Sequence, residues 1–127
     1  MLLLLTMVGA AVGAPSRWLI DQYVQTRHDS VFPWGTLVIN VAGSLLLGAL
    51  LSLGTAGRAS LNELALAGTG FCGGFTTFST FGYETVRLAE EGSIGEAILN
   101  VLGSVTLGLL ASVVGWQLVQ AAFAGAA

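Results

Sequence analysis

The chain carries very little charge and contains no lysine. Only 9% of its 127 residues are charged, whereas a soluble domain carries about 25%. Its four basic residues are scattered arginines, which excludes the basic patch that nucleic-acid binding requires. A lone cysteine, Cys72, excludes an intrachain disulfide, and the one histidine, His28, has no cysteine near it at metal-ligand spacing. With no catalytic constellation or phosphate-binding loop either, the sequence does not predict an enzyme.

Hydrophobic residues are abundant instead, at 54% of the chain. Four apolar segments cover about residues 2–20, 34–54, 63–88 and 94–122, and the charges lie between or at the ends of them. As helices, these segments are long enough to cross a bilayer. The N-terminus could be mistaken for a signal peptide cleaved after Ala14, but no basic residue precedes its apolar run. We therefore expect one all-α integral membrane domain, residues 1–127, with four transmembrane helices.

The sequence GFCGGFTTFSTF, from Gly70 to Phe81, interrupts the third segment. Its three glycines weaken a helix locally, and four hydroxyl side chains and three phenylalanines (Phe75, Phe78 and Phe81) follow the last of them. At membrane depth, irregular backbone is tolerated only where it is buried in protein or lines a polar cavity. The motif therefore predicts a break in the third helix that serves a function.

Asn40 lies inside the second segment, where an amide is costly unless it is paired. It either forms an interhelical hydrogen bond or donates to a passing anion. In the fourth segment Asn100 and Ser104 share a helix face with Gly108 and Ser112. Such serines often bond back to their own backbone, or they extend a polar track through the membrane.

Phe78 and Phe81 are three residues apart and lie on one helix face. They either pack in a core or present positive ring edges to a small anion. Glu84 is either an interfacial carboxylate or a group that orders water at a pore mouth. Arg17 is either an interfacial anchor or an attractor of anions.

The arginines give a weak orientation signal. Four spans would place Arg17, Arg27 and Arg87 on one side, and Arg58 on the other with the terminal amine. So small a bias lets the chain insert both ways round, which permits an antiparallel dimer. Small residues spaced by four, such as Gly9 and Gly13, predict close helix packing and an oligomer.

The Gly70–Phe81 motif, together with GTLVINVAGSLLLG (Gly35–Gly48) and GAPSRW (Gly13–Trp18), resembles the CrcB/Fluc family of fluoride channels over essentially the whole chain. This resemblance implies a dual-topology antiparallel homodimer in the cell membrane. The dimer would carry two pores for passive fluoride export, which gives fluoride resistance. The resemblance also implies a structural Na⁺ at the dimer centre, held by backbone carbonyls of Gly73 and Thr76.

The resemblance further assigns the pore lining. Phe78 and Phe81 would line each pore together with Asn40. The polar track would add Thr77, Ser79, Thr80, Glu84, Ser104 and Asn100. The fourth helix departs from the family pattern of a tyrosine and two serines spaced by four, because the stripe here is Asn100, Ser104 and Gly108.

Two other functions compete with this interpretation. A small proton-coupled multidrug exporter is also a four-helix dimer, but it needs a carboxylate deep in the membrane. All seven acidic residues here lie at or near span ends. A non-transporting membrane subunit would explain the glycines, but it gives no reason for hydroxyls and phenylalanines to cluster at a helix break.

Overall fold

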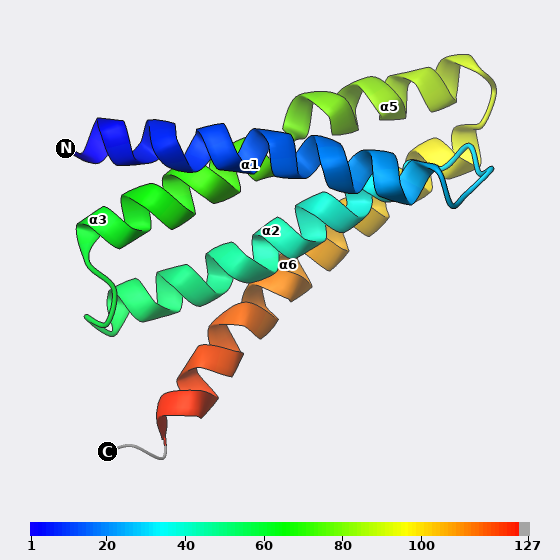
Figure 1. Ribbon diagram of the computed structural model, residues 1–127. Helices are drawn as coiled ribbons and strands as arrows, with labels where there is room; N and C mark the ends of the chain where they lie inside the picture. Colours follow the sequence, from blue (N-terminus) through cyan, green and yellow to red (C-terminus); the bar gives the residue numbers. More distant parts are fainter. Residues whose placement is uncertain (125–127) are drawn as a thin grey trace.

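The computed structural model describes residues 1–124, which contain helices and no strand. The predicted all-α class is therefore confirmed (Figure 1). The elements in chain order are α1 (Leu2–Gln25), α2 (Trp34–Thr55), α3 (Leu61–Glu63), η1 (Leu64–Cys72), α4 (Gly73–Phe75), α5 (Phe78–Glu90) and α6 (Ile94–Ala124).

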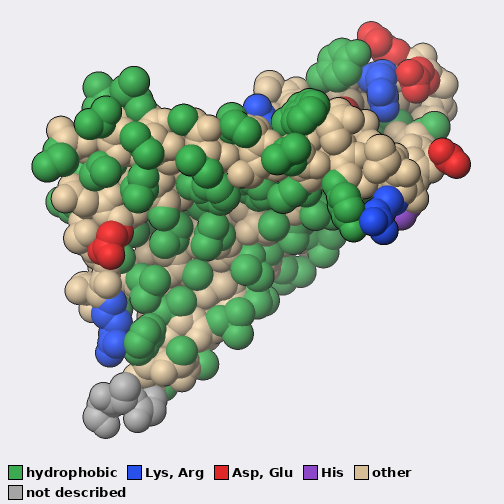
Figure 2. Space-filling view, viewed as in Figure 1, with side chains coloured by type: hydrophobic (Ala, Val, Ile, Leu, Met, Phe, Trp, Pro, Cys, Tyr) green, Lys and Arg blue, Asp and Glu red, His purple; other side chains and the backbone are tan. Residues whose placement is uncertain are grey.

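Three of these helices, α1, α2 and α6, are long and apolar enough to cross a membrane. They contain 24, 22 and 31 residues, and their most apolar stretches have mean hydropathies of 1.4, 2.0 and 2.1. The first helix continues to Gln25, beyond the expected end of the span near residue 20. A hydrogen bond of 2.8 Å from Gln25 Nε2 to Asp21 Oδ2 joins side chains in its last turns. Most charged side chains gather at the two ends of the molecule, with a hydrophobic surface between them (Figure 2), as a multi-pass membrane protein requires.

The third hydrophobic segment is bent, as the motif predicts. Helical backbone runs from Leu61 to Phe75, and α5 then starts at Phe78. Between them Thr76 (φ −77°, ψ 161°) and Thr77 (φ −147°, ψ 121°) are extended. The break therefore follows the glycines: Gly70 lies in the wide π-helical turns of η1, and Gly73 and Gly74 lie in α4.

Close contacts between α1 and the third segment explain why the third segment does not break at its own glycines. Glycines lie on both sides of these contacts. A Cβ on Gly9 would strike the carbonyl oxygen of Leu66, and one on Gly13 would strike that of Phe71. On the other side of the contact, a Cβ on Gly70 would lie 2.7 Å from the Thr6 carbonyl oxygen. The missing side chains let the two backbones approach closely, as small residues do in membrane helix pairs.

Helix α6 packs along α2, and the two run in the same direction (Figure 1). Gly48 lies against the backbone of Ser112, and Gly115 lies against that of Leu45. The far ends are joined by a hydrogen bond of 3.1 Å from Gln120 to Ser52.

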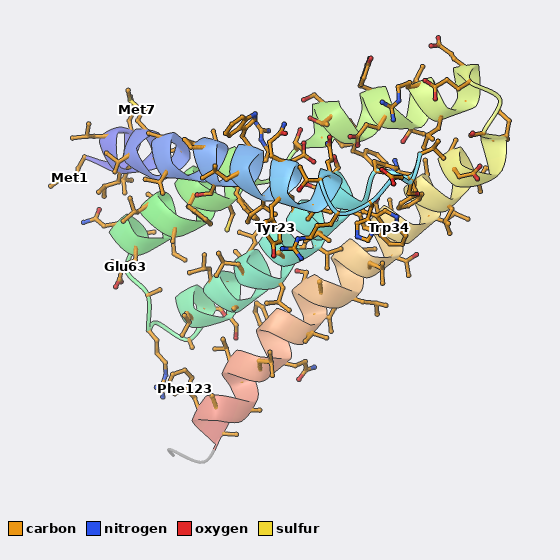
Figure 3. The ribbon with its side chains drawn as sticks, turned by 45° about the vertical axis from the view of Figure 1, so that its right-hand side comes forward. Met1, Met7, Tyr23, Trp34, Glu63 and Phe123 are labelled. Atoms are coloured by element: carbon orange, nitrogen blue, oxygen red, sulfur yellow. The ribbon has the colours of Figure 1, made fainter. Side chains whose placement is uncertain are left out.

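A cation–π contact lies beyond that hydrogen bond. The Arg58 guanidinium sits 3.8 Å from the ring centroid of Phe123, near the end of α6. Figure 3 shows Met1, Glu63 and Phe123 toward one end of the molecule and Trp34 toward the other. Helix α2 is thus held by α6 on one side and faces the broken segment on another.

Candidate functional site

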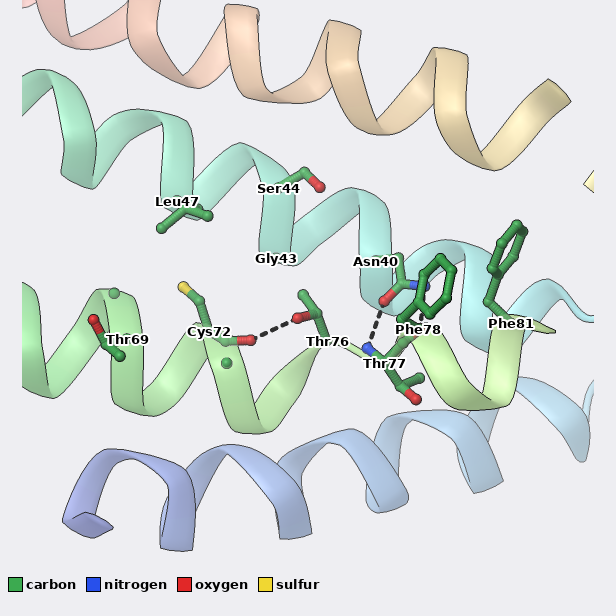
Figure 4. A pocket seen from close by; sticks show the side chains of 12 residues that line it. Asn40, Gly43, Ser44, Leu47, Thr69, Cys72, Thr76, Thr77, Phe78 and Phe81 are labelled. Atoms are coloured by element: carbon green, nitrogen blue, oxygen red, sulfur yellow. Dashed lines mark hydrogen bonds between the residues drawn. The ribbon is translucent and has the colours of Figure 1, made fainter. Parts of the chain in front are cut away.

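The Asn40 side chain holds the break in place. Its Nδ2 donates to the Thr77 carbonyl oxygen at 2.9 Å, and its Oδ1 accepts from the Thr77 N–H at 2.8 Å (Figure 4). The amide thus makes the interhelical hydrogen bond that was one of its two predicted roles. The pair satisfies both backbone groups of an extended residue, which would be costly to leave unpaired at membrane depth. An amide nitrogen carries two hydrogens, and this pair uses one of them.

Thr77 also begins α5. Its Oγ1 accepts from the Thr80 N–H at 3.2 Å, so the side chain caps the helix. The same oxygen lies 2.9 Å from Thr80 Oγ1 and 3.4 Å from Ser79 Oγ. Three of the predicted hydroxyls are therefore neighbours at the N-terminus of a 13-residue helix. Helix N-termini carry partial positive charge and favour anions.

The break also frees carbonyl oxygens. In an unbroken helix the Thr77 N–H would donate to the carbonyl oxygen of Gly73, but here it donates to Asn40 Oδ1. The N–H and the hydroxyl of Thr76 both donate to the Cys72 carbonyl oxygen, at 2.9 and 2.8 Å. Within residues 1–124, no donor reaches the carbonyl oxygens of Gly73 or Thr76. These two oxygens are free to accept a hydrogen bond or to bind a cation.

A pocket of about 560 Å³ opens between α2 and the broken segment (Figure 4). It brings together six of the predicted site residues, which are Asn40, Gly73, Thr76, Thr77, Phe78 and Phe81. The two rings have centroids 5.7 Å apart with planes tilted by 48°. Phe78 is 83% exposed in the single chain, so one protomer covers little of this ring.

Asn100 and Ser104 lie outside this pocket but connect to it. Asn100 is completely buried, and its Nδ2 donates to Thr85 Oγ1 at 2.9 Å. Ser104 Oγ donates to Asn100 Oδ1 at 3.3 Å, and Thr85 donates to the Phe81 carbonyl oxygen at 2.8 Å. This chain of hydrogen bonds joins α6 to α5 just beside the rings. Sequence reasoning missed Thr85, although it follows Phe81 by one helical turn.

Glu84 is more buried than an interfacial carboxylate would be. Only 9% of the residue is exposed, and its Oε2 has no hydrogen-bond partner in the described part of the chain. With Arg87 it lines a second pocket of about 230 Å³, near the loop between α1 and α2. The structure therefore separates Glu84 from the pocket at the break. Arg87 forms a weak ion pair with Glu91, in which Arg87 Nε and Glu91 Oε1 are 3.9 Å apart.

Comparison with known proteins shows which family this chain resembles. Residues 4–116 match the family model described as CrcB-like protein, Camphor Resistance (CrcB). The chain is 51% identical over 121 residues to the "Fluoride-specific ion channel FluC 1" of Streptomyces avermitilis, covering 95% of this chain and 98% of that protein.

Other bacterial proteins are similar at lower identity. The "Fluoride-specific ion channel FluC" of Shewanella frigidimarina is 44% identical over 116 residues, covering 91% of this chain and 94% of that protein. The protein with the same name from Thermus thermophilus is 40% identical over 115 residues, covering 91% of each. The match with the family model and these near full-length similarities extend over the break and the Asn40 helix alike. The chain belongs to the CrcB family of membrane proteins.

Proposed function

We propose that this chain conducts fluoride passively across the cell membrane, through a pore that begins at the pocket beside the broken helix. One observation carries the proposal: an amide, several hydroxyls and two phenylalanine rings converge on a 560 Å³ pocket where the backbone leaves the helix. Relatives over more than nine-tenths of the chain are named fluoride-specific ion channels, which gives the anion its identity.

Fluoride is small and strongly hydrated, so a pore must replace its water with hydrogen-bond donors and positive dipoles. The second N–H of Asn40 and the hydroxyls around Thr77 are such donors. Ring edges of Phe78 and Phe81 carry partial positive charge, and the α5 N-terminus adds more. These groups bind the ion weakly enough to let it leave. Glu84, Ser104 and Asn100 extend the polar track in this proposal, and the narrow passage would exclude larger chloride.

The proposed functional unit is an antiparallel homodimer with four spans per chain and two pores. A polar pocket that faced lipid would be costly, and Phe78 lies 83% exposed in the single chain. A second copy, inserted the other way round, would cover both. The charge bias of one arginine against three is weak enough to allow both orientations.

A structural Na⁺ at the dimer centre is consistent with the free carbonyl oxygens. Hard cations prefer oxygen ligands, and Gly73 and Thr76 each present a carbonyl oxygen that no donor reaches within the described residues. Two oxygens from one chain are too few for a closed site, so a second copy would complete it. The ion would make its surroundings more favourable for anions.

Passive conduction gives protection in acidic surroundings. Hydrogen fluoride crosses the membrane as a neutral molecule and releases its proton at the higher internal pH. The trapped fluoride then leaves through the channel down its gradient. No energy source is required, and no enzyme chemistry is involved.

A proton-coupled exporter is not favoured. Such a protein needs a carboxylate that exchanges protons beside its substrate site. The residues that line the pocket at the break include no acid. Glu84, the one buried carboxylate among residues 1–124, faces a different pocket. The relatives are named as channels.

Efflux from liposomes that contain only this purified chain tests the proposal. Liposomes are loaded with potassium fluoride or potassium chloride, and valinomycin starts the release by letting potassium follow. We expect fluoride to leave rapidly and chloride to leave no faster than from protein-free liposomes. Equal rates for the two anions would reject fluoride selectivity, and no release of either would reject the channel.

A further inference from the structure

Ser44 of α2 stands between two hollows of the molecule. It lines the pocket at the break together with Asn40, one helical turn earlier. It also lines a second hollow of about 340 Å³ along α6, where Ser104, Gly108 and Ser112 are its neighbours. Of the two side chains common to both linings, Ser44 and Leu47, only Ser44 has a hydrogen-bond donor.

The hydroxyl of Ser44 is free, in contrast to several other hydroxyls in the helices of this chain. Serines and threonines inside helices commonly donate to the backbone carbonyl one turn earlier. Ser16, Thr76 and Thr85 all do so here, at 2.8 Å. Ser44 has no hydrogen bond to any residue among 1–124 and is only half-buried. Its donor therefore remains available to something that enters either hollow.

The position opposite Ser44 lacks a side chain. Ser104, Gly108 and Ser112 follow one another at helical spacing along α6, and Gly108 interrupts their row of hydroxyls. A Cβ built on Gly108 would lie 3.5 Å from Ser44 Oγ, an ordinary contact distance. The Ser44 hydroxyl thus lies at the same position along α6 as the side chain that residue 108 lacks.

We propose that Ser44 donates a hydrogen bond to fluoride between the pocket at the break and the hollow along α6. In this role it replaces the hydroxyl that Gly108 does not provide. The inference rests on the proposed conduction of fluoride and adds an α2 residue to its path. It also predicts that the donor can be moved across the gap, from residue 44 to residue 108.

Fluoride efflux from liposomes tests this with Ser44→Ala. Because one hydrogen bond to a charged group is lost, we expect fluoride release to slow by about tenfold. Ser44→Thr, which keeps the hydroxyl, should release fluoride at close to the wild-type rate. If Ser44→Ala gives too little folded protein, Ser44→Cys keeps the size but is a weak donor, and the same slowing is expected.

A second substitution moves the donor across the gap. Adding Gly108→Ser to Ser44→Ala should restore most of the rate, because the open space at residue 108 accepts a side chain. Adding Gly108→Ala instead fills the same space without a hydroxyl and should restore nothing.

Three results would overturn the inference. Ser44→Ala and Ser44→Cys could both conduct like wild type, or the slowed Ser44→Ala could fail to respond to Gly108→Ser. Alternatively, Gly108→Ala could rescue as well as Gly108→Ser, which would make shape the cause. These results leave the channel function standing, since wild-type protein still releases fluoride. Wild-type protein that releases no fluoride would reject the proposed function, and this inference with it.

Discussion

The two sides of the third hydrophobic segment differ in what they contact. Toward α1 the segment is tightly packed, because Gly70 and Gly74 lie against the backbone of that helix. Toward α2 it opens into a pocket of about 560 Å³ lined by hydroxyls, an amide and two rings. The same motif therefore supplies glycines for packing and polar groups for the proposed pore.

This difference explains where the helix breaks. Glycines weaken a helix, but here the close contact of Gly70 and Gly74 with α1 keeps the backbone helical through Phe75. The backbone becomes extended only at Thr76 and Thr77, where Asn40 takes over both hydrogen bonds of Thr77. The α1 side therefore holds the segment in place, and the α2 side shapes the break.

Asn40→Asp should have the largest effect, because it changes the α2 side directly. A carboxylate cannot donate to the Thr77 carbonyl oxygen, and its negative charge repels an anion in the pocket. We expect fluoride efflux from liposomes to fall by about 100-fold or more. The control is Asn62→Asp, which adds the same charge at an exposed position of α3 and should conduct normally. Wild-type efflux by Asn40→Asp would remove Asn40 from the pore.

Gly70→Ala should damage the α1 side. Its Cβ would lie 2.7 Å from the Thr6 carbonyl oxygen, so the helices must move apart, which costs about 1–3 kcal/mol of unfolding free energy. The matched control is Gly82→Ala in α5, where a Cβ meets nothing within 4 Å. Denaturation in detergent micelles compares the two. Equal stabilities would show that the close contact with α1 is unimportant.

Phe78→Ile and Phe81→Ile keep hydrophobic bulk on the α2 side but remove the ring edges. Ring interactions are worth about 0.5–1.5 kcal/mol, so we expect each variant to slow fluoride efflux by up to about tenfold and to leave assembly unchanged. Phe71→Ile is the control, since that ring stacks on Phe75 at 5.4 Å, away from the pocket lining. If both pocket variants conduct like Phe71→Ile, the ring edges play no part.

Thr77→Val should have the smallest effect of the four. It keeps the shape and the backbone pairing with Asn40 but removes the oxygen that caps α5. Loss of a helix cap lowers the free energy of unfolding by about 1 kcal/mol. Thr77→Ser keeps the capping oxygen and should be as stable as wild type. Denaturation of the two variants in detergent micelles measures their stabilities. A Thr77→Val protein as stable as wild type would show that the cap is dispensable.

Much of this fold is predictable from sequence. Uncharged runs predict the helices α1, α2 and α6, because length and hydropathy alone decide whether a helix can span a bilayer. The break is also predictable, since a cluster of hydroxyls at membrane depth needs a polar environment. The family resemblance, carried by the Gly70–Phe81 motif, is confirmed by the match over residues 4–116.

The contacts between helices are less predictable. Asn40 and Thr77 are 37 residues apart, and no local pattern says that one pairs with the other's backbone. The bond from Asn100 to Thr85 depends likewise on how α5 and α6 approach. The burial of Glu84 depends on how α5 meets the loop between α1 and α2. Helical spacing identifies which residues share a face, but it leaves open which neighbour that face meets.

The conformation of Thr76 and Thr77 in a lipid bilayer tests the central claim most directly. Solid-state NMR of the labelled protein reports backbone conformation through its ¹³C chemical shifts and the Asn40 amide through its ¹⁵N shifts. We predict extended shifts at both threonines, helical shifts at Phe75 and Ser79, and a change of the Asn40 ¹⁵N shift when fluoride is added. Helical shifts throughout residues 61–90, with an amide that ignores fluoride, would contradict the account.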